Sequence, residues 1–227
     1  MVLYKLQYWL KKRNWYRQAQ RTPIAELYAQ PSLSGGTKVI DQDFLVVDCE
    51  MSGLDPKSNE LLSLGWVRVK NGRIDYATRK HLLVHSKQTV GESIQIHGLC
   101  DQRLAGASSV SMALGLLAKH AEGAVLVFHH AVLDIAFIQR AAFNCFACPL
   151  LFSYIDTMQI EQGRLARSGQ SAPLQLASCR DRYGLPAAFQ HNAMFDAVAT
   201  AELFLAQYSH LKSARGLSLE GLAPRVS

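Results

Sequence analysis

The chain has 227 residues, of which 49% are hydrophobic and 19% are charged. This length fits one α/β domain with an appendage, and the apolar content is high enough to form a core, which excludes a globally disordered chain. No run of eighteen apolar residues predicts a membrane-spanning helix, and no cleavage site of a secretory signal follows the N-terminal residues. Five cysteines without a framework spacing favour reduced thiols, so we expect a cytoplasmic protein.

The positive charge is concentrated at one end of the sequence. The whole chain has a formal net charge of +6. Residues 1–40 hold seven Lys and Arg against a single Glu, so the remainder of the chain is neutral overall. A polyanionic partner would therefore bind this N-terminal arm, residues 1–40, rather than the domain that follows it.

The N-terminal arm has apolar residues at helical spacing over residues 2–10, followed by basic residues interleaved with aromatic ones. Thr22-Pro23 interrupts this pattern, a second short helix is predicted after it, and residues 31–36 have the composition of a linker. Three interpretations of the arm stay open. The first is a helix packed on the domain or on a partner chain, the second is a contact with single-stranded nucleic acid, and the third is a membrane-surface helix.

From Asp41 onward the sequence shows short apolar runs separated by turn residues. Asn71-Gly72 lies between two of these runs and predicts a two-residue hairpin. Strands in a meander, followed by strands that alternate with helices, indicate a mixed sheet covered by helices. Strands are predicted over residues 44–47, 61–69, 74–84, 124–128 and 151–155, and helices over residues 109–120, 131–143, 174–183 and 192–208.

Two carboxylates end the first predicted strand. Asp48 and Glu50 are two residues apart, so their side chains point to the same face, while Cys49 points to the other face and the core. Neighbouring carboxylates repel each other and raise each other's pKa unless a positive charge lies between them. Oxygen ligands of this kind suit Mg²⁺ or Mn²⁺. Asp48 and Glu50 alone are weak evidence for a metal site, because most Asp-x-Glu triplets are exposed strand or turn residues.

Two further acids and a histidine lie at the predicted starts of helices. Asp134 follows the fourth strand, and Asp196 follows the predicted N-cap Asn192. From this helix Asp196 can reach the carboxylates of the first strand. His191 shares that site if it belongs to the loop before the helix, where a pKa near neutrality suits a general base.

Three motifs in this order resemble the DEDDh family of 3′–5′ exonucleases, which includes the proofreading ε subunit of bacterial DNA polymerase III, RNase T and oligoribonuclease. The resemblance covers residues 42–209. Secondary landmarks over residues 61–67 and 96–99 and at Asp156-Thr157 agree with it. The family usually has Asn where this chain has His130. The motifs are residues 47–56, with Asp48 and Glu50, residues 130–134, with Asp134, and residues 191–197, with His191 and Asp196.

The resemblance implies an α/β, RNase H-like fold with a five-stranded mixed sheet and helices on both faces. The exonuclease domain would span residues 41–210, after the basic arm of residues 1–40 and before a short tail of residues 211–227. The implied reaction is hydrolysis of the terminal phosphodiester at a 3′ end with two divalent cations, Mg²⁺ or Mn²⁺, and release of nucleoside 5′-monophosphates.

The resemblance also implies a role for each motif residue. Asp48 would bridge both cations, Glu50 and Asp196 would hold the cation that activates water, Asp134 would serve the second cation, and His191 would accept the proton of the attacking water. The implied substrate contacts are Met51, Ser52, Gly53, Leu54, Ile96, His97 and His130. For Ile96, a place in the core is an equal alternative.

Single-stranded DNA is the favoured substrate, in proofreading or repair, because residues 96–99 and the spacing from His191 to Asp196 look like the ε subunit. RNA 3′-end trimming is the alternative, because residues 51–56 look somewhat like oligoribonuclease. A non-catalytic nucleic-acid-binding protein on the same fold is a third interpretation. A protein partner that binds residues 1–40 and a homodimer are both compatible with the sequence.

Overall fold

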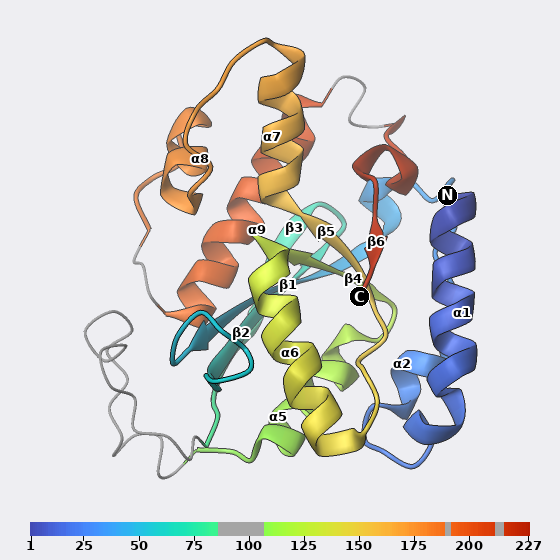
Figure 1. The fold of residues 1–227 in the computed structure, drawn as a ribbon. Coiled ribbons are helices and arrows are strands. Elements are labelled where there is room, and N and C mark those ends of the chain that lie inside the picture. Colours follow the sequence, from blue (N-terminus) through green and yellow to red (C-terminus); the bar gives the residue numbers. More distant parts are fainter. Residues whose placement is uncertain (86–106, 189–191, 212–215) are drawn as a thin grey trace.

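The computed structural model describes residues 1–85, 107–188, 192–211 and 216–227. Its centre is a six-stranded sheet in the order β3-β2-β1-β4-β5-β6 (Figure 1). β1 pairs antiparallel with β2 and parallel with β4, and the sheet is therefore mixed, as predicted. The strands are β1 (Asp43–Met51), β2 (Leu61–Lys70), β3 (Arg73–Leu83), β4 (Ala124–Phe128), β5 (Ser153–Asp156) and β6 (Arg225–Val226).

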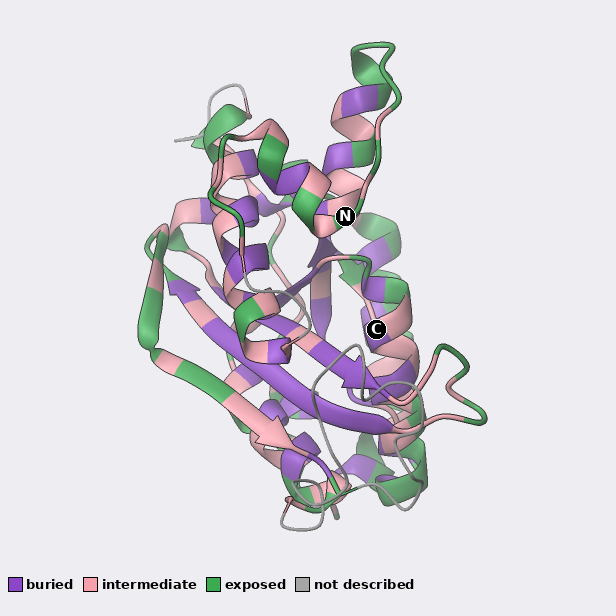
Figure 2. Cartoon of the chain, turned by 90° about the vertical axis from the view of Figure 1, so that its left-hand side faces the viewer, coloured by how far each residue is buried: buried purple, intermediate pink, exposed green. Residues whose placement is uncertain are grey.

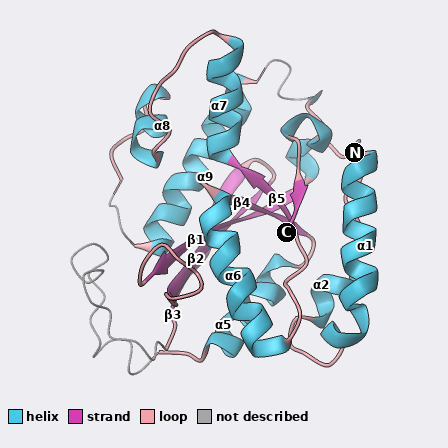
Figure 3. Cartoon of the chain, in the orientation of Figure 1, coloured by secondary structure: helices cyan, strands magenta, loops and turns pink. Residues whose placement is uncertain are grey.

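Helices cover both faces of this sheet (Figure 3). Alternate residues of β1 point to opposite faces, so Leu45 and Val47 pack under one set of helices and Phe44 and Val46 under the other. The first core includes residues of α1 (Val2–Ala19), α2 (Ala25–Ala29), α5 (Val110–Ala121) and α6 (Ala131–Phe146). The second core includes residues of α9 (Ala193–His210) and of the 3₁₀ turns Val39–Asp41 and Leu219–Leu222. Two further helices, α7 (Thr157–Arg167) and α8 (Leu176–Arg182), extend beyond the sheet.

β1 and β2 are largely apolar, which fits strands with both faces covered. β1 and β2 are buried along most of their length, whereas the edge strand β3 exposes many of its residues (Figure 2). The predicted hairpin joins β2 to β3. Asn71 and Gly72 both have positive φ, 51° and 69°, which is the backbone that a two-residue turn of this type requires.

Two elements depart from the sequence-based prediction. β6 makes the sheet six-stranded instead of five-stranded, and two residues are too short to carry a strand pattern. α7 is the second element, and no sequence pattern predicted it. Its buried positions are Thr157, Glu161 and Leu165, so two of the three are polar and hide the helical periodicity.

The N-terminal arm forms α1 and α2, which pack on the rest of the chain. α1 is longer than the apolar pattern indicated and continues to Ala19, just before Thr22-Pro23. The Tyr28 hydroxyl donates a hydrogen bond to the carbonyl oxygen of Pro149 at 2.7 Å. Among the described residues, no helix is long and apolar enough to cross a membrane.

Gly65 on β2 sets how closely α9 approaches the sheet. It lies opposite Asp48 in the register of β1 and β2. A methyl group on Gly65 would lie 2.1 Å from the carbonyl carbon of Ala193 and 2.2 Å from the amide nitrogen of Met194. The first turn of α9 therefore rests on a position that has no side chain, directly beside Asp48.

Replacing Gly65 by Ala is expected to lower the free energy of unfolding by about 3 kcal/mol, because backbone atoms of α9 must move to admit the methyl group. Urea unfolding measures this change. Gly36→Ala is the matched control, because a methyl group there meets no atom within 4 Å and the change should stay within about 0.5 kcal/mol. Equal stability of the two variants would contradict the close approach.

Candidate active site

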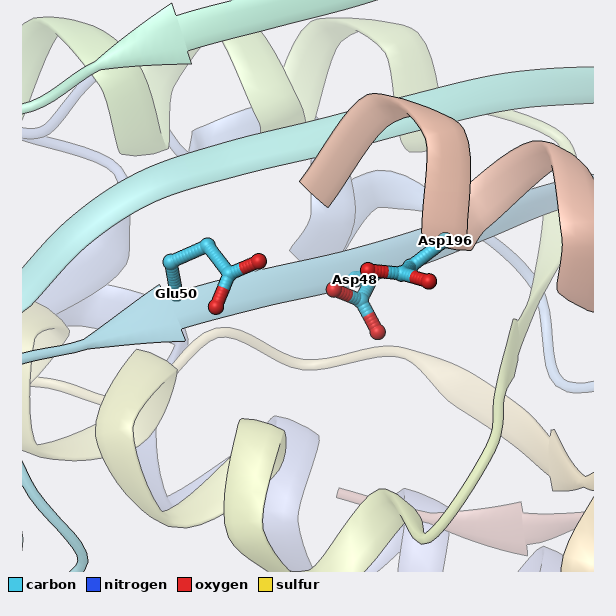
Figure 4. A group of neighbouring side chains, drawn as sticks. All are labelled: Asp48, Glu50 and Asp196. Atoms are coloured by element: carbon cyan, nitrogen blue, oxygen red, sulfur yellow. The ribbon is translucent and has the colours of Figure 1, made fainter. Parts of the chain in front are cut away.

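Three carboxylates come together between β1 and α9. Asp48 and Glu50 project from the same face of β1, and Asp196 reaches them from the first turns of α9 (Figure 4). One oxygen from each of the three lies within 4.8 Å of the others. The arrangement follows from the two-residue spacing on the strand and from the seating of α9 on Gly65.

The start of α9 is fixed by reciprocal hydrogen bonds. The Asn192 side chain accepts hydrogen bonds from the amides of Met194 and Phe195, as the predicted N-cap should. The Asp196 carboxylate accepts a hydrogen bond from the amide of Asn192 at 3.1 Å. Asp196 is thus held in the first turns of α9 while it faces Asp48.

Asp134 approaches from the opposite face of the sheet. It is buried on α6, which packs with Cys49 rather than with Asp48. The parallel pairing of β1 with β4 ends at Val46, and beyond it the amide of Cys49 donates a hydrogen bond to the Asp134 carboxylate at 3.0 Å. Asp134 is therefore a neighbour of Asp48 but lies outside the three-carboxylate group.

Asp156 fixes the start of α6, a role that the sequence analysis did not assign. Its carboxylate accepts hydrogen bonds from the amides of His130, Ala131 and Met158, so it caps both α6 and α7. An Asp between a strand and a helix is the signal that would have identified this cap. His130 has φ 67° and ψ 50°, a left-handed conformation in which both Asn and His are enriched.

Burial and mutual repulsion act on the pKa values of the carboxylates at this site. Burial raises the pKa of Asp48 well above its usual value, and the neighbouring carboxylates of Asp134, Asp196 and Glu50 raise it further. Burial also raises the pKa of Asp134 to about 7, against the effect of its hydrogen bonds with Cys49. Converging oxygen ligands that repel one another fit a divalent cation such as Mg²⁺ or Mn²⁺.

The carboxylates open onto a cleft of about 830 Å³. Its lining comprises the three carboxylates, His129 and His130, Met158, residues of α8 and the segment after α8 over residues 185–188. His129 joins the two sides of the cleft, because its ring nitrogens contact the Thr157 hydroxyl and the Leu174 carbonyl, each at 2.8 Å. Arg180 joins α8 to α9 by donating to the carbonyl of Ala199 at 2.6 Å.

Glu161 connects α7 to α8 behind the cleft. Its side chain is fully buried, and it accepts hydrogen bonds from Arg164, Arg182 and Tyr183. Burial by itself would raise the pKa of Glu161, but these three donors outweigh it and lower the pKa to about 2. The ionised carboxylate therefore stabilises the position of α8 as a wall of the cleft.

The other predicted substrate contacts lie apart from the cleft lining. Met51 packs in the core, and Ser52 exchanges hydrogen bonds with the backbone of Glu60. The space above Gly53 is taken up by the Asn59 side chain, and Leu54 is 80% exposed. Predictions for three further site residues fall outside the described part of the chain: His191, Ile96 and His97.

The chain matches a known protein family over most of its length. The sequence pattern of the RNase T exonuclease family matches residues 45–204, more than two thirds of the chain. The chain belongs to the exonuclease family. The match spans all three motifs, so the family resemblance predicted from them is confirmed.

Curated relatives of this exonuclease domain include replication proteins. A DNA polymerase III of PolC type from Thermotoga maritima is 28% identical over 176 residues, which are 77% of this chain and 12% of that protein. A DNA polymerase III subunit epsilon-like protein from Rhodobacter capsulatus is 32% identical over 183 residues, 78% of this chain and 25% of that protein. The chain thus spans only 12–25% of the length of these two relatives.

Solved structures share the fold of this exonuclease domain at low identity. E. coli exonuclease I in complex with a dA16 oligonucleotide aligns with a TM-score of 0.61 and 12% identity, over 76% of this chain and 42% of that one. Cell-death related nuclease 4 aligns with a TM-score of 0.58 and 15% identity, over 74% of this chain and 64% of that one. At these identities the likeness shows the fold.

Replacing Asp48 by Asn is expected to raise the melting temperature of the cation-free protein by about 2–4 °C, because it removes one of the repelling carboxylates. The same change should weaken Mn²⁺ binding at least about tenfold. Scanning calorimetry with and without Mn²⁺ measures both effects. Asp75→Asn, on the edge strand β3, should change neither, and tight Mn²⁺ binding by Asp48→Asn would contradict the cation site.

Replacing Glu161 by Gln is expected to lower the free energy of unfolding at pH 7 by about 2 kcal/mol. The folded-state pKa of about 2 is below the ordinary value of 4.5, so the contribution of the carboxylate is complete above pH 4.5 and is lost as the pH falls towards 2. The difference between the two proteins should shrink across that interval in urea titrations, whereas Glu122→Gln should have little effect at any pH. A difference that does not depend on pH would contradict this role.

Proposed function

We propose that this chain is a 3′–5′ exonuclease that depends on divalent cations and removes nucleoside 5′-monophosphates from single-stranded nucleic acid, with DNA as the preferred substrate. The observation that carries the proposal is the convergence of Asp48, Glu50 and Asp196 within 4.8 Å at an open cleft, with Asp134 beside them. Membership of the exonuclease family supports the reaction class.

The four carboxylates have separate tasks in this proposal. Asp48, Glu50 and Asp196 would hold one cation, and Asp48 and Asp134 would serve a second. When bound, the cations supply Lewis-acid activation of a water and stabilise the leaving 3′ oxygen. The seating of α9 on Gly65 and the cap at Asp156 keep Asp196 and Asp134 in position, so little rearrangement is needed when substrate binds.

His191 is proposed as the general base, since it stands one residue before the N-cap Asn192 in the sequence. It would accept a proton from the attacking water as the water oxygen forms a bond to phosphorus. The bond from phosphorus to the 3′ oxygen breaks, and this oxygen takes up a proton from solvent. The shortened strand then leaves with a 3′ hydroxyl, and the excised residue leaves as a nucleoside 5′-monophosphate. The cleft is lined by residues of α8 and by residues 185–188, and it is the proposed place of the terminal nucleotide.

The choice of DNA rests on similarity to proteins whose names state it. The relatives from Thermotoga maritima and Rhodobacter capsulatus are named for DNA polymerase III, and E. coli exonuclease I was solved with a dA16 oligonucleotide. The basic charge lies in the N-terminal arm and leaves the domain neutral overall, which favours single strands over a duplex bound through a broad basic face.

The test is degradation of 5′-labelled single strands of DNA and RNA, side by side, with Mg²⁺ and with Mn²⁺. We expect a ladder that shortens from the 3′ end, faster on DNA than on RNA. Asp196→Asn should reduce the rate of degradation by at least about 10³-fold, because the three-carboxylate group then loses one of its charged cation ligands. Asp75→Asn should retain the full rate. Faster cleavage of RNA would reverse the substrate preference, and no cleavage of either strand would favour a binding protein.

A further inference from the structure

α1 is anchored to the rest of the chain by one side only. Tyr4 and Tyr8 are buried, and their hydroxyls contact the Ser153 hydroxyl and the carbonyl of Gln30. Gln18 donates a hydrogen bond to the carbonyl of Phe146 at 3.0 Å, and Trp15 packs edge-on against Phe143. The helix is therefore already formed and fixed before any partner binds.

The opposite side of α1 exposes large apolar side chains. Val2 is 85% exposed, Leu3 67%, and Leu6 and Trp9 51% each. At 3.6 residues per turn these side chains, together with the exposed Leu10 and Tyr16, fall within a sector about 140° wide. We call this sector the outer face of α1, and it consists of Val2, Leu3, Leu6, Trp9, Leu10, Arg13, Tyr16 and Arg17.

The charge of α1 has a single sign. The helix carries five Lys and Arg and no acidic residue. Lys11 and Lys12 turn back to the carbonyls of Ser227 and Gln30, whereas Lys5, Arg13 and Arg17 are exposed at or beside the outer face. The guanidinium of Arg13 stacks over the ring of Trp9 at 4.6 Å.

The chemistry of the outer face disfavours two kinds of partner. Single-stranded nucleic acid stacks its bases on flat rings, and most of the apolar side chains here are aliphatic. A second copy of α1 in antiparallel pairing would place Arg13 and Arg17 against the leucines of its partner. The outer face of α1 combines apolar side chains with interleaved cations. It therefore matches a partner surface that accepts apolar side chains and carries many anionic groups.

We propose that the outer face of α1 docks on the surface of a bilayer that contains anionic phospholipids. The aliphatic side chains enter the boundary between headgroups and acyl chains, Trp9 and Tyr16 lie at the headgroup level, and the exposed cations contact phosphates. Because the helix is preformed, docking does not have to order it.

Docking by this face leaves the cleft accessible. α1 contacts β6, at one edge of the sheet, whereas α9 and the carboxylates lie towards the β2 and β3 side (Figure 1). The membrane proposal does not rest on the proposed nuclease activity, since none of the residues on the outer face belongs to the carboxylate site.

The test is co-sedimentation of the full chain with vesicles, either of phosphatidylcholine alone or of an equal mixture with phosphatidylglycerol. We expect binding to the mixed vesicles, at least about tenfold weaker binding to phosphatidylcholine alone, and weakening with added salt. The double variant Leu3→Gln, Leu6→Gln should lose at least about tenfold in partition to the mixed vesicles. Both side chains are exposed, so the fold should tolerate the change, and urea unfolding verifies that it does.

Met112→Gln is the matched control, because Met112 is an apolar side chain on α5 that is 65% exposed and away from α1. It should bind vesicles like the unchanged protein. Failure of the full chain to bind the mixed vesicles would overturn the proposal, and so would unchanged binding by the double variant. Two further results would overturn the membrane proposal in favour of another partner. One is a dimer in light scattering that the double variant abolishes, and the other is oligonucleotide binding that the double variant abolishes.

Discussion

The contact between the backbone of α9 and the sheet at Gly65 determines where the acidic side chains meet. Gly65 is the residue of β2 that faces Asp48 across the ladder, and the first turn of α9 occupies the space that a side chain would fill there. Asp196, four residues after the N-cap of α9, is thereby brought beside Asp48 and Glu50. The small residues Ala193, Ala197 and Ala201 extend this close packing along the helix.

The site is assembled from both faces of the sheet, and this imposes an electrostatic cost. Asp48 and Glu50 share a face with α9, while Asp134 belongs to α6 on the other side and is satisfied by the amide of Cys49. Backbone amides donate hydrogen bonds to Asp134 and Asp156, whereas burial and the neighbouring carboxylates raise the pKa of Asp48. A cation is the natural complement of such an arrangement, because it removes the repulsion that the fold maintains.

A second set of polar interactions holds the wall of the cleft in place. Glu161 fixes α8 to α7, Arg180 fixes it to α9, and His129 attaches the segment before α8 to the end of β4. The cleft thus has three independent connections to the sheet and its helices. The basic and apolar outer face of α1 belongs to a different side of the molecule.

The elements whose signals are local could be predicted from the amino-acid sequence. The apolar runs of β1 to β5, the hairpin at Asn71-Gly72 and the shared face of Asp48 and Glu50 follow from periodicity and turn chemistry. α7 and β6 escaped prediction, because the buried face of α7 is largely polar and β6 is two residues long. The folded structure was needed to show that α9 rests on Gly65, that Asp134 arrives from the opposite face and that Asp156 also accepts hydrogen bonds from the start of α6. These are contacts between segments distant in sequence, and no local pattern encodes them.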